Sequence, residues 1–463
     1  MTQPRHVRPP KESQPVYPRP IQVTYRRLQD LQEDPGNPRL HTAAQIHQIA
    51  LSIQTFGFNV PVLLDGAGRI LAGHGRVLAC RELGWTEVPT IRLDHLTEAQ
   101  TRAFQIADNR LTEQSTWDDR LLGEQLKALA ELDLDFNLES TGFTMGEIDL
   151  RIQGLGGLAP GTTAPDPADE VPPVLDEPVS RLGDLWQLGP HRLACGNALE
   201  TGDIQSLMHG RKAALVFTDP PYNVPIAGNV GGLGRIQHRD FLMACGEMSP
   251  EAFTAFLGKA FQVLTAHIRD GSLVYVFMDW RHQAELLSAA RQMAWEQRNL
   301  CVWVKDNAGM GSFYRSQHEL VLIFKHGKGN PRNNIQLGKF GRNRSNVWHY
   351  PGSNSFARSG EEGNLLALHP TVKPVALVVD ALLDASSRGD LVLDPFLGSG
   401  STLIAAERVG RVCRGLELDP AYVDTAIRRW QNWTGESAIR AADGTTFNTL
   451  ECVQKESGAD HVG

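Results

Sequence analysis

An acid, two prolines and an aromatic ring stand together in the segment Thr218-Asp219-Pro220-Pro221-Tyr222-Asn223. It follows the apolar run 213–217, which is typical of a strand buried on both faces. Because proline lacks an N–H and fixes φ, the pair favours a stiff turn over a continued strand. Asp219 and the carbonyl of Pro220 could accept both hydrogens of an amino group on a nucleobase, while Tyr222 stacks on its ring. For this segment alone, a Pro-rich turn with an incidental acid is the better interpretation.

A glycine-rich segment downstream changes that balance. Asp394-Pro395-Phe396-Leu397-Gly398-Ser399-Gly400 lies between the apolar run 391–393 and a helical pattern over 401–409. A strand, a glycine turn and a helix in this order let backbone N–H groups approach a ligand closely. Glu417 ends the next predicted strand, where an acid can bind a ribose diol. G-x-G-x-x-G is absent, so a nucleoside cofactor without phosphates fits better than NAD.

Three motifs in one order carry a family resemblance. Residues 219–222 resemble the D-P-P-Y catalytic motif of DNA amino-methyltransferases, and residues 394–400 resemble their D-P-F-x-G-S-G motif for S-adenosylmethionine. Residues 369–374, His-Pro-Thr-Val-Lys-Pro, resemble the H-P-T-x-K-P motif that precedes it. This order is that of the β group of the family, and the resemblance covers about residues 181–435.

The resemblance implies roles for individual residues and S-adenosylmethionine as cofactor, without a metal. The catalytic set is Asp219, Pro220, Pro221 and Tyr222. The cofactor-binding set is Asp394, Phe396, Gly398, Gly400, Glu417, Thr371 and Lys373, together with Asn197, which stands where relatives often have Gly-Asp near the adenine.

The implied reaction is methylation of adenine N6 in duplex DNA after the base has left the helix. Cytosine-N4 methylation is the nearest alternative, because serine often replaces the first Asp in those enzymes. Methylation of RNA or of a protein glutamine is less favoured, since Asn-Pro-Pro-Tyr is usual there. An inert methyltransferase fold beside an active DNA-binding module is a fourth alternative. Cytosine-C5 chemistry needs a Pro-Cys nucleophile, which the chain lacks. No endonuclease motif is evident, which favours a solitary or phage-type enzyme over one with a restriction partner.

The stretch 305–368 interrupts the alternation of helices and strands and is the expected target-recognition region. Residues 325–344 are basic and contain no Asp or Glu, although the net charge of the chain is −8. Arg and Asn read base edges in the major groove. The predicted DNA contacts are Arg315, Lys339, Arg342, Asn343 and Arg344, with Arg76 of the first domain. We interpret His318 and Glu319 as structural polar residues at the start of a strand.

The N-terminal block resembles the ParB/sulfiredoxin-like domain. Asn37-Pro38-Arg39 matches its first box, and Gly73-His74-Gly75-Arg76 occupies its G-E-R-R box. Gly75 replaces the first arginine of partition proteins, and His74 replaces the catalytic cysteine of sulfiredoxins. Nucleotide hydrolysis and sulfiredoxin chemistry are therefore not expected. A helix N-terminus with Arg76 can still bind a phosphate of DNA or of a nucleotide, and a simple tight turn is the equal alternative.

The fold class that we predict is α/β, a doubly wound and mainly parallel sheet with a smaller N-terminal α+β domain. The boundaries are a disordered tail at 1–20, the ParB-like domain at 21–153, a solvated Pro- and acid-rich linker at 154–180, the methyltransferase domain at 181–440 and a tail at 441–463.

Composition sets further expectations for the 463 residues. No apolar run reaches the length of a membrane span, and the N-terminus lacks the apolar stretch of a secretory signal. Scattered cysteines without a C-x-x-C pair are typical of reduced thiols in a cytoplasmic, prokaryotic or phage-encoded protein. Double-stranded DNA is the expected partner, no membrane is, and a homodimer is one option.

Overall fold

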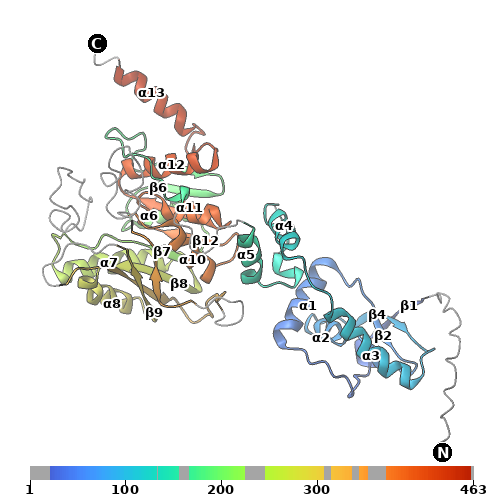
Figure 1. Cartoon of the computed structure of the whole chain (residues 1–463). Coiled ribbons are helices and arrows are strands. Elements are labelled where there is room, and N and C mark those ends of the chain that lie inside the picture. The colour runs from blue at the N-terminus through green and yellow to red at the C-terminus, as the bar shows by residue number, and fades with distance from the viewer. Residues whose placement is uncertain are drawn as a thin grey trace, which may run out of the picture. The chain divides into compact units, whose positions relative to one another are not determined.

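The computed structural model describes residues 21–132, 134–155, 166–224, 246–306, 314–335, 344–352 and 372–459. The chain divides into two compact units, Met1–Thr144 and Met145–Gly463, and Figure 1 labels many of their elements. Each unit has its own sheet.

The first unit contains a four-stranded sheet in the order β1-β4-β2-β3. The strands are β1 (Val23–Arg27), β2 (Val62–Leu64), β3 (Ile70–Ala72) and β4 (Glu87–Arg92), and only β2 and β4 pair in parallel. The helices are α1 (Ala43–Phe56), α2 (His74–Glu82), α3 (Glu98–Glu113) and α4 (Asp119–Ala130), with 3-10 turns at Leu28–Asp30 and Leu138–Thr141. Thr97 and Gln100 form a capping box at the start of α3.

The second unit contains a ten-stranded sheet in the order β11-β9-β10-β8-β7-β12-β13-β6-β5-β14. Its strands are β5 (Leu185–Leu188), β6 (His191–Cys195), β7 (Ala213–Thr218), β8 (Ile268–Met278), β9 (Glu296–Val304), β10 (His318–Lys325), β11 (Val347–His349), β12 (Leu391–Asp394), β13 (Val412–Glu417) and β14 (Ile439–Arg440). The strands from β8 to β6 in this order are all parallel, while β10, β5 and β14 run antiparallel to their neighbours. The predicted fold class is confirmed.

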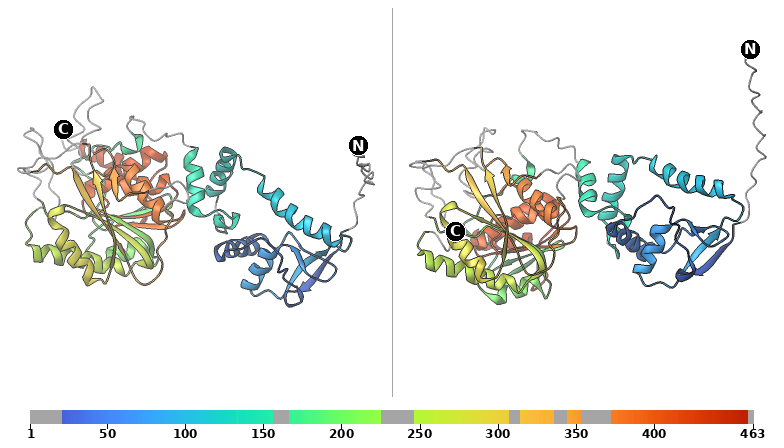
Figure 2. Two further views of the ribbon diagram at one scale, coloured as in Figure 1. Left: turned by 60° about the horizontal axis from the view of Figure 1, so that its bottom comes forward. Right: turned by 90° about the horizontal axis from the view of Figure 1, so that it is seen from below.

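Helices cover both faces of this sheet, as Figure 2 shows. One face packs against α6 (Thr201–Met208), α7 (Pro250–Thr265) and α8 (Gln283–Gln292), and the other against α10 (Val375–Ala385), α11 (Ser401–Arg408) and α12 (Pro420–Thr434). Helix α7 begins where the Ser249 side chain accepts from the N–H of Ala252, with Pro250 in the first turn. Its Phe253, Leu257 and Phe261 recur at helical spacing and are fully buried.

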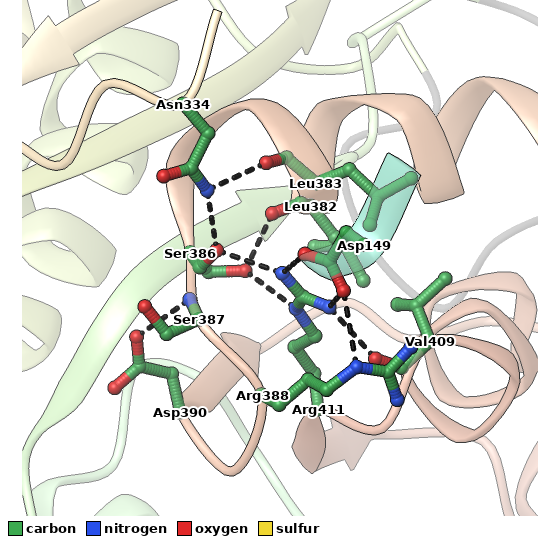
Figure 3. Close-up of polar contacts among 10 residues, drawn as sticks. All are labelled: Asp149, Asn334, Leu382, Leu383, Ser386, Ser387, Arg388, Asp390, Val409 and Arg411. Atoms are coloured by element: carbon green, nitrogen blue, oxygen red, sulfur yellow. Dashed lines mark hydrogen bonds and ion pairs between the residues drawn. The ribbon is translucent and has the colours of Figure 1, made fainter. Parts of the chain in front are cut away.

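Helix α5 (Met145–Gly154) packs with the second unit, which corrects the boundary predicted at residue 153. Its Asp149 is completely buried and pairs with Arg411, which precedes β13 (Figure 3). A buried carboxylate is costly unless it is paired, so this contact binds α5 to the methyltransferase sheet.

Residues 166–180 are not the solvated linker that their prolines and acids predict. Asp166 pairs with Arg408, and the Asp169 carboxylate accepts from the backbone N–H of Val375 at 2.7 Å. The Ala168 carbonyl accepts from the buried Arg429 at 2.8 Å, and Ser180 is 1% exposed. Asp166 and Asp169 are therefore binding groups for the domain that follows.

The predicted C-terminal tail contains a helix, α13 (Phe447–Ala459). Phe447 is fully buried and packs edge-on against Trp186 of β5 with a centroid separation of 5.4 Å. Burial of a whole aromatic side chain stabilises this end of the chain against the sheet. The methyltransferase unit therefore continues past residue 440.

Within the described parts of the chain, no helix combines the length and apolar character that crossing a bilayer requires.

Candidate active site

The two predicted loops open on one cavity. Strands β7 and β12 are parallel neighbours, so the turn after Thr218 and the turn after Asp394 leave the same edge of the sheet. Asp219, Tyr222, Asp394 and Gly398 all line the cavity, which measures about 1180 Å³ including its solvent-open mouth. The catalytic turn and the glycine-rich turn therefore border one shared space.

Asp219 lies at the centre of a buried polar network. The Tyr222 hydroxyl donates to Asp219 Oδ1, and the Lys373 ammonium donates to Asp219 Oδ2 at 2.5 Å. Burial raises the pKa of Asp219 and outweighs the opposing effect of the Lys373 charge. The two donors thus hold the Asp219 carboxylate in a fixed position at the wall of the cavity. Pro220 and Pro221 line the cavity beside it.

Glu319, interpreted from the sequence as structural, belongs to this network. Its Oε2 lies 2.9 Å from the Tyr222 hydroxyl and 3.1 Å from Lys373 Nζ, while its Oε1 pairs with Lys305. Burial alone would raise the pKa of Glu319, but the charges of Lys373 and Lys305 lower it to about 2. Sequence reasoning did not place Glu319 beside Asp219, and it reaches this network because the antiparallel strand β10 starts at the edge of the sheet where the parallel strands β7 and β8 end. The available signal was an acid directly before the apolar run 320–324.

The glycine-rich turn has the backbone that a closely bound cofactor requires. Gly398 and Gly400 have φ of +55° and +87°, which other residues rarely adopt. A Cβ on Gly400 would lie 3.0 Å from that of Ala426, while a Cβ on Gly398 would point into open space. Asp394 accepts from Thr402 at 2.7 Å and from the N–H of Phe396 at 3.1 Å. Burial raises its pKa to about 7.

Glu417 stands at the end of β13 and lines the same cavity. Its carboxylate accepts from the N–H groups of Gly398 at 2.8 Å and Asp419 at 2.9 Å, which fixes it beside the glycine turn. Phe396, Leu418 and Tyr422 add apolar walls. An open cradle at a glycine, a fixed acid and apolar walls fit a nucleoside cofactor with a ribose diol.

Two of the predicted cofactor residues direct their polar groups to other partners, although Lys373 also lines the cavity. Lys373 directs its ammonium to Asp219, and its backbone carbonyl accepts from Ser401 at 2.8 Å. The Asn197 amide oxygen accepts from the N–H of Leu199 at 3.0 Å, and it is Gly196 and Ala198 that line the cavity. Thr371 lies outside the described residues.

The DNA contacts predicted for the target-recognition region separate into three groups. Arg315 is exposed beside β10. Arg344 instead pairs with Asp380 at 2.7 Å and Asp384 at 3.0 Å on α10, a correction that follows from the two acids facing it. Lys339, Arg342 and Asn343 lie outside the described residues.

Arg76 lines a polar pocket in the first unit with Arg39, His41 and His74. Its guanidinium donates to the backbone carbonyls of Val60 and Pro61, the latter at 3.2 Å. Gly73, at the N-cap of α2, has φ of +102° and allows the turn into the helix. The predicted tight turn and a polar pocket at the helix N-terminus are both present.

Family models match both parts of the chain. The model of the DNA methylase family of N6 and N4 enzymes matches residues 213–428, which include both cavity loops. The model of the ParB-methyltransferase HTH domain matches residues 120–182, from α4 through α5 to the segment that binds Val375.

Individual proteins are similar over different parts. The ParB-like nuclease domain-containing protein YnaK of Escherichia coli K12 is 44% identical over 80 residues, which are 17% of this chain and 92% of that protein. The type II methyltransferase M.HpaI of Haemophilus parainfluenzae is 27% identical over 254 residues, 51% of this chain and 73% of that protein. The structure of TTHA0409 of Thermus thermophilus, a DNA modification methylase with S-adenosyl-L-methionine, has a TM-score of 0.37 at 23% identity, covering 55% of this chain and 96% of its own.

The motifs, the sheet and the family models agree. Residues 213–428 form a DNA methylase domain of the N6/N4 amino-methyltransferase family, whose cofactor is S-adenosylmethionine, and a ParB-like domain precedes it in the sequence.

Proposed function

We propose that the protein methylates the N6 amino group of adenine in duplex DNA after the base has been flipped out of the helix. The observation that carries the proposal is the shared cavity of the Asp219 turn and the Gly398 turn. The choice of adenine over cytosine rests on Asp219, because the cytosine-N4 enzymes that this chain resembles often have serine at this position.

Each side chain has a defined task in this scheme. Asp219 and the Pro220 carbonyl accept from the target amino group and direct its nitrogen, and Tyr222 stacks on the base. Glu417 receives the ribose diol of the cofactor, and the turn at Gly398 admits its backbone contacts. When bound, the cofactor supplies an electrophilic methyl group. Because the amino nitrogen is itself the nucleophile, positioning gives most of the acceleration and no covalent enzyme intermediate is needed.

The base must leave the duplex because its amino group is otherwise held in base pairing. Flipping the base out of the duplex costs roughly a few kcal/mol of free energy, and DNA contacts outside the cavity must offset this cost. Arg315, exposed beside β10, is one such contact, and Arg76 of the ParB-like domain is a second, weaker candidate. A homodimer and a cytoplasmic location remain predictions, and sedimentation velocity of the full chain tests the first.

Nucleoside analysis tests the base assignment. A host lacking its own DNA methyltransferases expresses either the wild-type chain or Asp219→Ala, and its DNA is digested and examined by mass spectrometry and methylation-sensitive sequencing. We expect N6-methyladenine at one short sequence with the wild type and none with the variant. N4-methylcytosine would reject the adenine assignment, and unmodified DNA from cells with abundant folded protein would reject the function.

A further inference from the structure

Lys373 has no role in the scheme above, yet it contacts the catalytic turn directly. Its Nζ lies 2.5 Å from Asp219 Oδ2, 3.1 Å from Glu319 Oε2 and 3.2 Å from the Tyr222 hydroxyl. Lys373 lines the cavity together with Asp219 and Tyr222. A hydrogen-bond donor therefore stands beside the acceptor that is assigned to the target amino group.

Carboxylates and aromatic rings around Lys373 hold its ammonium in this position. The Lys373 side chain is 6% exposed, and Nζ lies 5.0 Å from the centroid of Phe277 and 5.8 Å from that of Trp303. Such an ammonium is stable only when it is paired, and aromatic faces add a smaller attraction. Glu319 supplies the second carboxylate, and Lys305 holds Glu319 from its other oxygen. The two lysines and two carboxylates balance in charge.

Asp219 offers a hydrogen-bond acceptor beside the donor of Lys373, and this pair complements a base edge with a donor beside an acceptor. Adenine carries the N6 amino group next to the unprotonated N1, and cytosine carries the N4 amino group next to the unprotonated N3. On the same edge, guanine has a ring N–H between a carbonyl oxygen and an amino group, and thymine has a ring N–H between two carbonyl oxygens, so both offer a donor where adenine and cytosine offer an acceptor. An acid alone selects an amino group, whereas the pair selects an amino group with a neighbouring ring nitrogen.

We propose that Lys373 donates a hydrogen bond to the ring nitrogen beside the target amino group while Asp219 accepts from that amino group, and that Glu319 is the residue that positions Lys373. The inference rests on the proposed function and assigns its base-reading contact. On binding, the longest of the three lysine contacts, to the Tyr222 hydroxyl, is exchanged for the base. Tyr222 keeps its contacts to Asp219 and Glu319.

Deaza bases isolate this contact. In 1-deazaadenine and 3-deazacytosine, a C–H replaces the ring nitrogen and the amino group remains. Duplexes carry either the natural target base or its deaza analogue at the position that sequencing of host DNA identifies. A hydrogen bond from a charged donor is worth about 1.5–3 kcal/mol. We expect the wild type to lose about 10- to 100-fold in kcat/KM on the deaza duplex.

Variants assign the loss to Lys373. Lys373→Met should treat natural and deaza duplexes alike, within about 3-fold, and Glu319→Gln should discriminate less than the wild type. Lys325→Met, at the other end of β10 and paired with Glu296, is the matched control and should discriminate as the wild type does. If a variant turns over too slowly, dissociation constants of the same duplexes with S-adenosylhomocysteine present give the same comparison. Cofactor binding and melting temperature report whether each variant is folded.

The outcomes are distinct. Equal use of natural and deaza duplexes by the wild type, or undiminished discrimination by Lys373→Met, overturns the role of Lys373 and leaves the proposed function standing. Failure of the folded wild type to methylate any natural base overturns the proposed function and this inference with it.

Discussion

The Lys373 ammonium lies 2.5 Å from the Asp219 carboxylate, although the two residues are 154 positions apart in the chain. This pair joins the catalytic turn after β7 to the segment that leads into α10. It also makes Asp219 a group with fixed partners instead of an isolated acid at a strand end.

Asp219→Asn tests the catalytic carboxylate with little change in shape. The amide keeps one acceptor but loses the negative charge that faces the amino group and Lys373. We expect single-turnover methylation of DNA to fall by roughly 100-fold or more, because preorganised electrostatic contacts of this kind have such effects. Cofactor binding by calorimetry should change little. An unchanged rate in a folded variant would remove Asp219 from the catalytic set.

Alanine substitutions at Gly398 and Gly400 should separate binding from folding. Both positions have positive φ, which costs an alanine about 1 kcal/mol. Only at Gly400 does the new Cβ also meet Ala426, at 3.0 Å. We therefore expect Gly400→Ala to lower the melting temperature more, and Gly398→Ala to weaken cofactor binding about 10-fold with a small loss of stability.

Gly444→Ala is the matched control for this comparison. Gly444 has φ of +74° and no atom within 4 Å of an added Cβ, and it does not line the cavity. It should show the cost of the backbone alone and normal cofactor affinity. Equal cofactor affinity of Gly398→Ala and Gly444→Ala would argue against contact between the cofactor and the turn at Gly398.

Asp394 should make stability depend on pH in an unusual direction. Burial raises its pKa to about 7 from an ordinary value of 3.8. Between these values the folded protein holds a proton that the unfolded chain has released. The stability from this group is therefore complete below about pH 4 and is lost as the pH rises through 7.

Asp394→Asn removes that titration and keeps an acceptor for the N–H of Phe396. We expect the variant to melt above the wild type at pH 8, by an amount that corresponds to at most about 4 kcal/mol. The difference should shrink toward pH 5. A difference that grows as the pH falls would show that Asp394 is ionised throughout.

The buried pair of Asp149 and Arg411 should be important for docking of α5. Arg411 uses all its N–H groups, on both Asp149 oxygens, on Ser386 and on the Val409 carbonyl, and Arg388 adds a further ion pair to Asp149 (Figure 3). Asp149→Ala leaves buried positive charge and should cost about 3–5 kcal/mol in unfolding free energy.

Two further variants, measured by calorimetry, show whether the lost stability comes from the unpaired buried charge. The double variant Asp149→Leu with Arg411→Leu should recover part of it, since no unpaired charge then remains on either residue. Asp443→Ala, which breaks the exposed pair with Arg440, should change the melting temperature little. A small effect of Asp149→Ala would mean that α5 is held by its apolar contacts alone.

Local sequence was sufficient for the two loops because each follows directly from an apolar strand. Asp219 and Gly398 reach one cavity through the parallel pairing of β7 and β12, which a doubly wound sheet implies. Lys305 and Glu319 could not be placed in this way. They meet through the antiparallel register of β9 and β10, which places Glu319 opposite Trp303, and local pattern does not determine register between distant strands.

Burial of charged segments was the other limit. Composition favours solvent for Asp149, Asp166 and Asp169, and each is bound by a partner far along the chain. Asp149 and Arg411 are 262 positions apart, and Asp166 and Arg408 are 242 apart. In both pairs, the residues next to the acid in the sequence do not indicate which partner it binds.

The most direct test of the central claim is transfer of a labelled methyl group from S-adenosylmethionine to unmethylated duplex DNA in vitro, followed by separation of the nucleosides. A single cavity that is bordered by the Asp219 and Gly398 turns predicts label in N6-methyladenine with the wild type and none with Asp219→Ala. Cofactor binding by the folded wild-type chain without any label in DNA would contradict it.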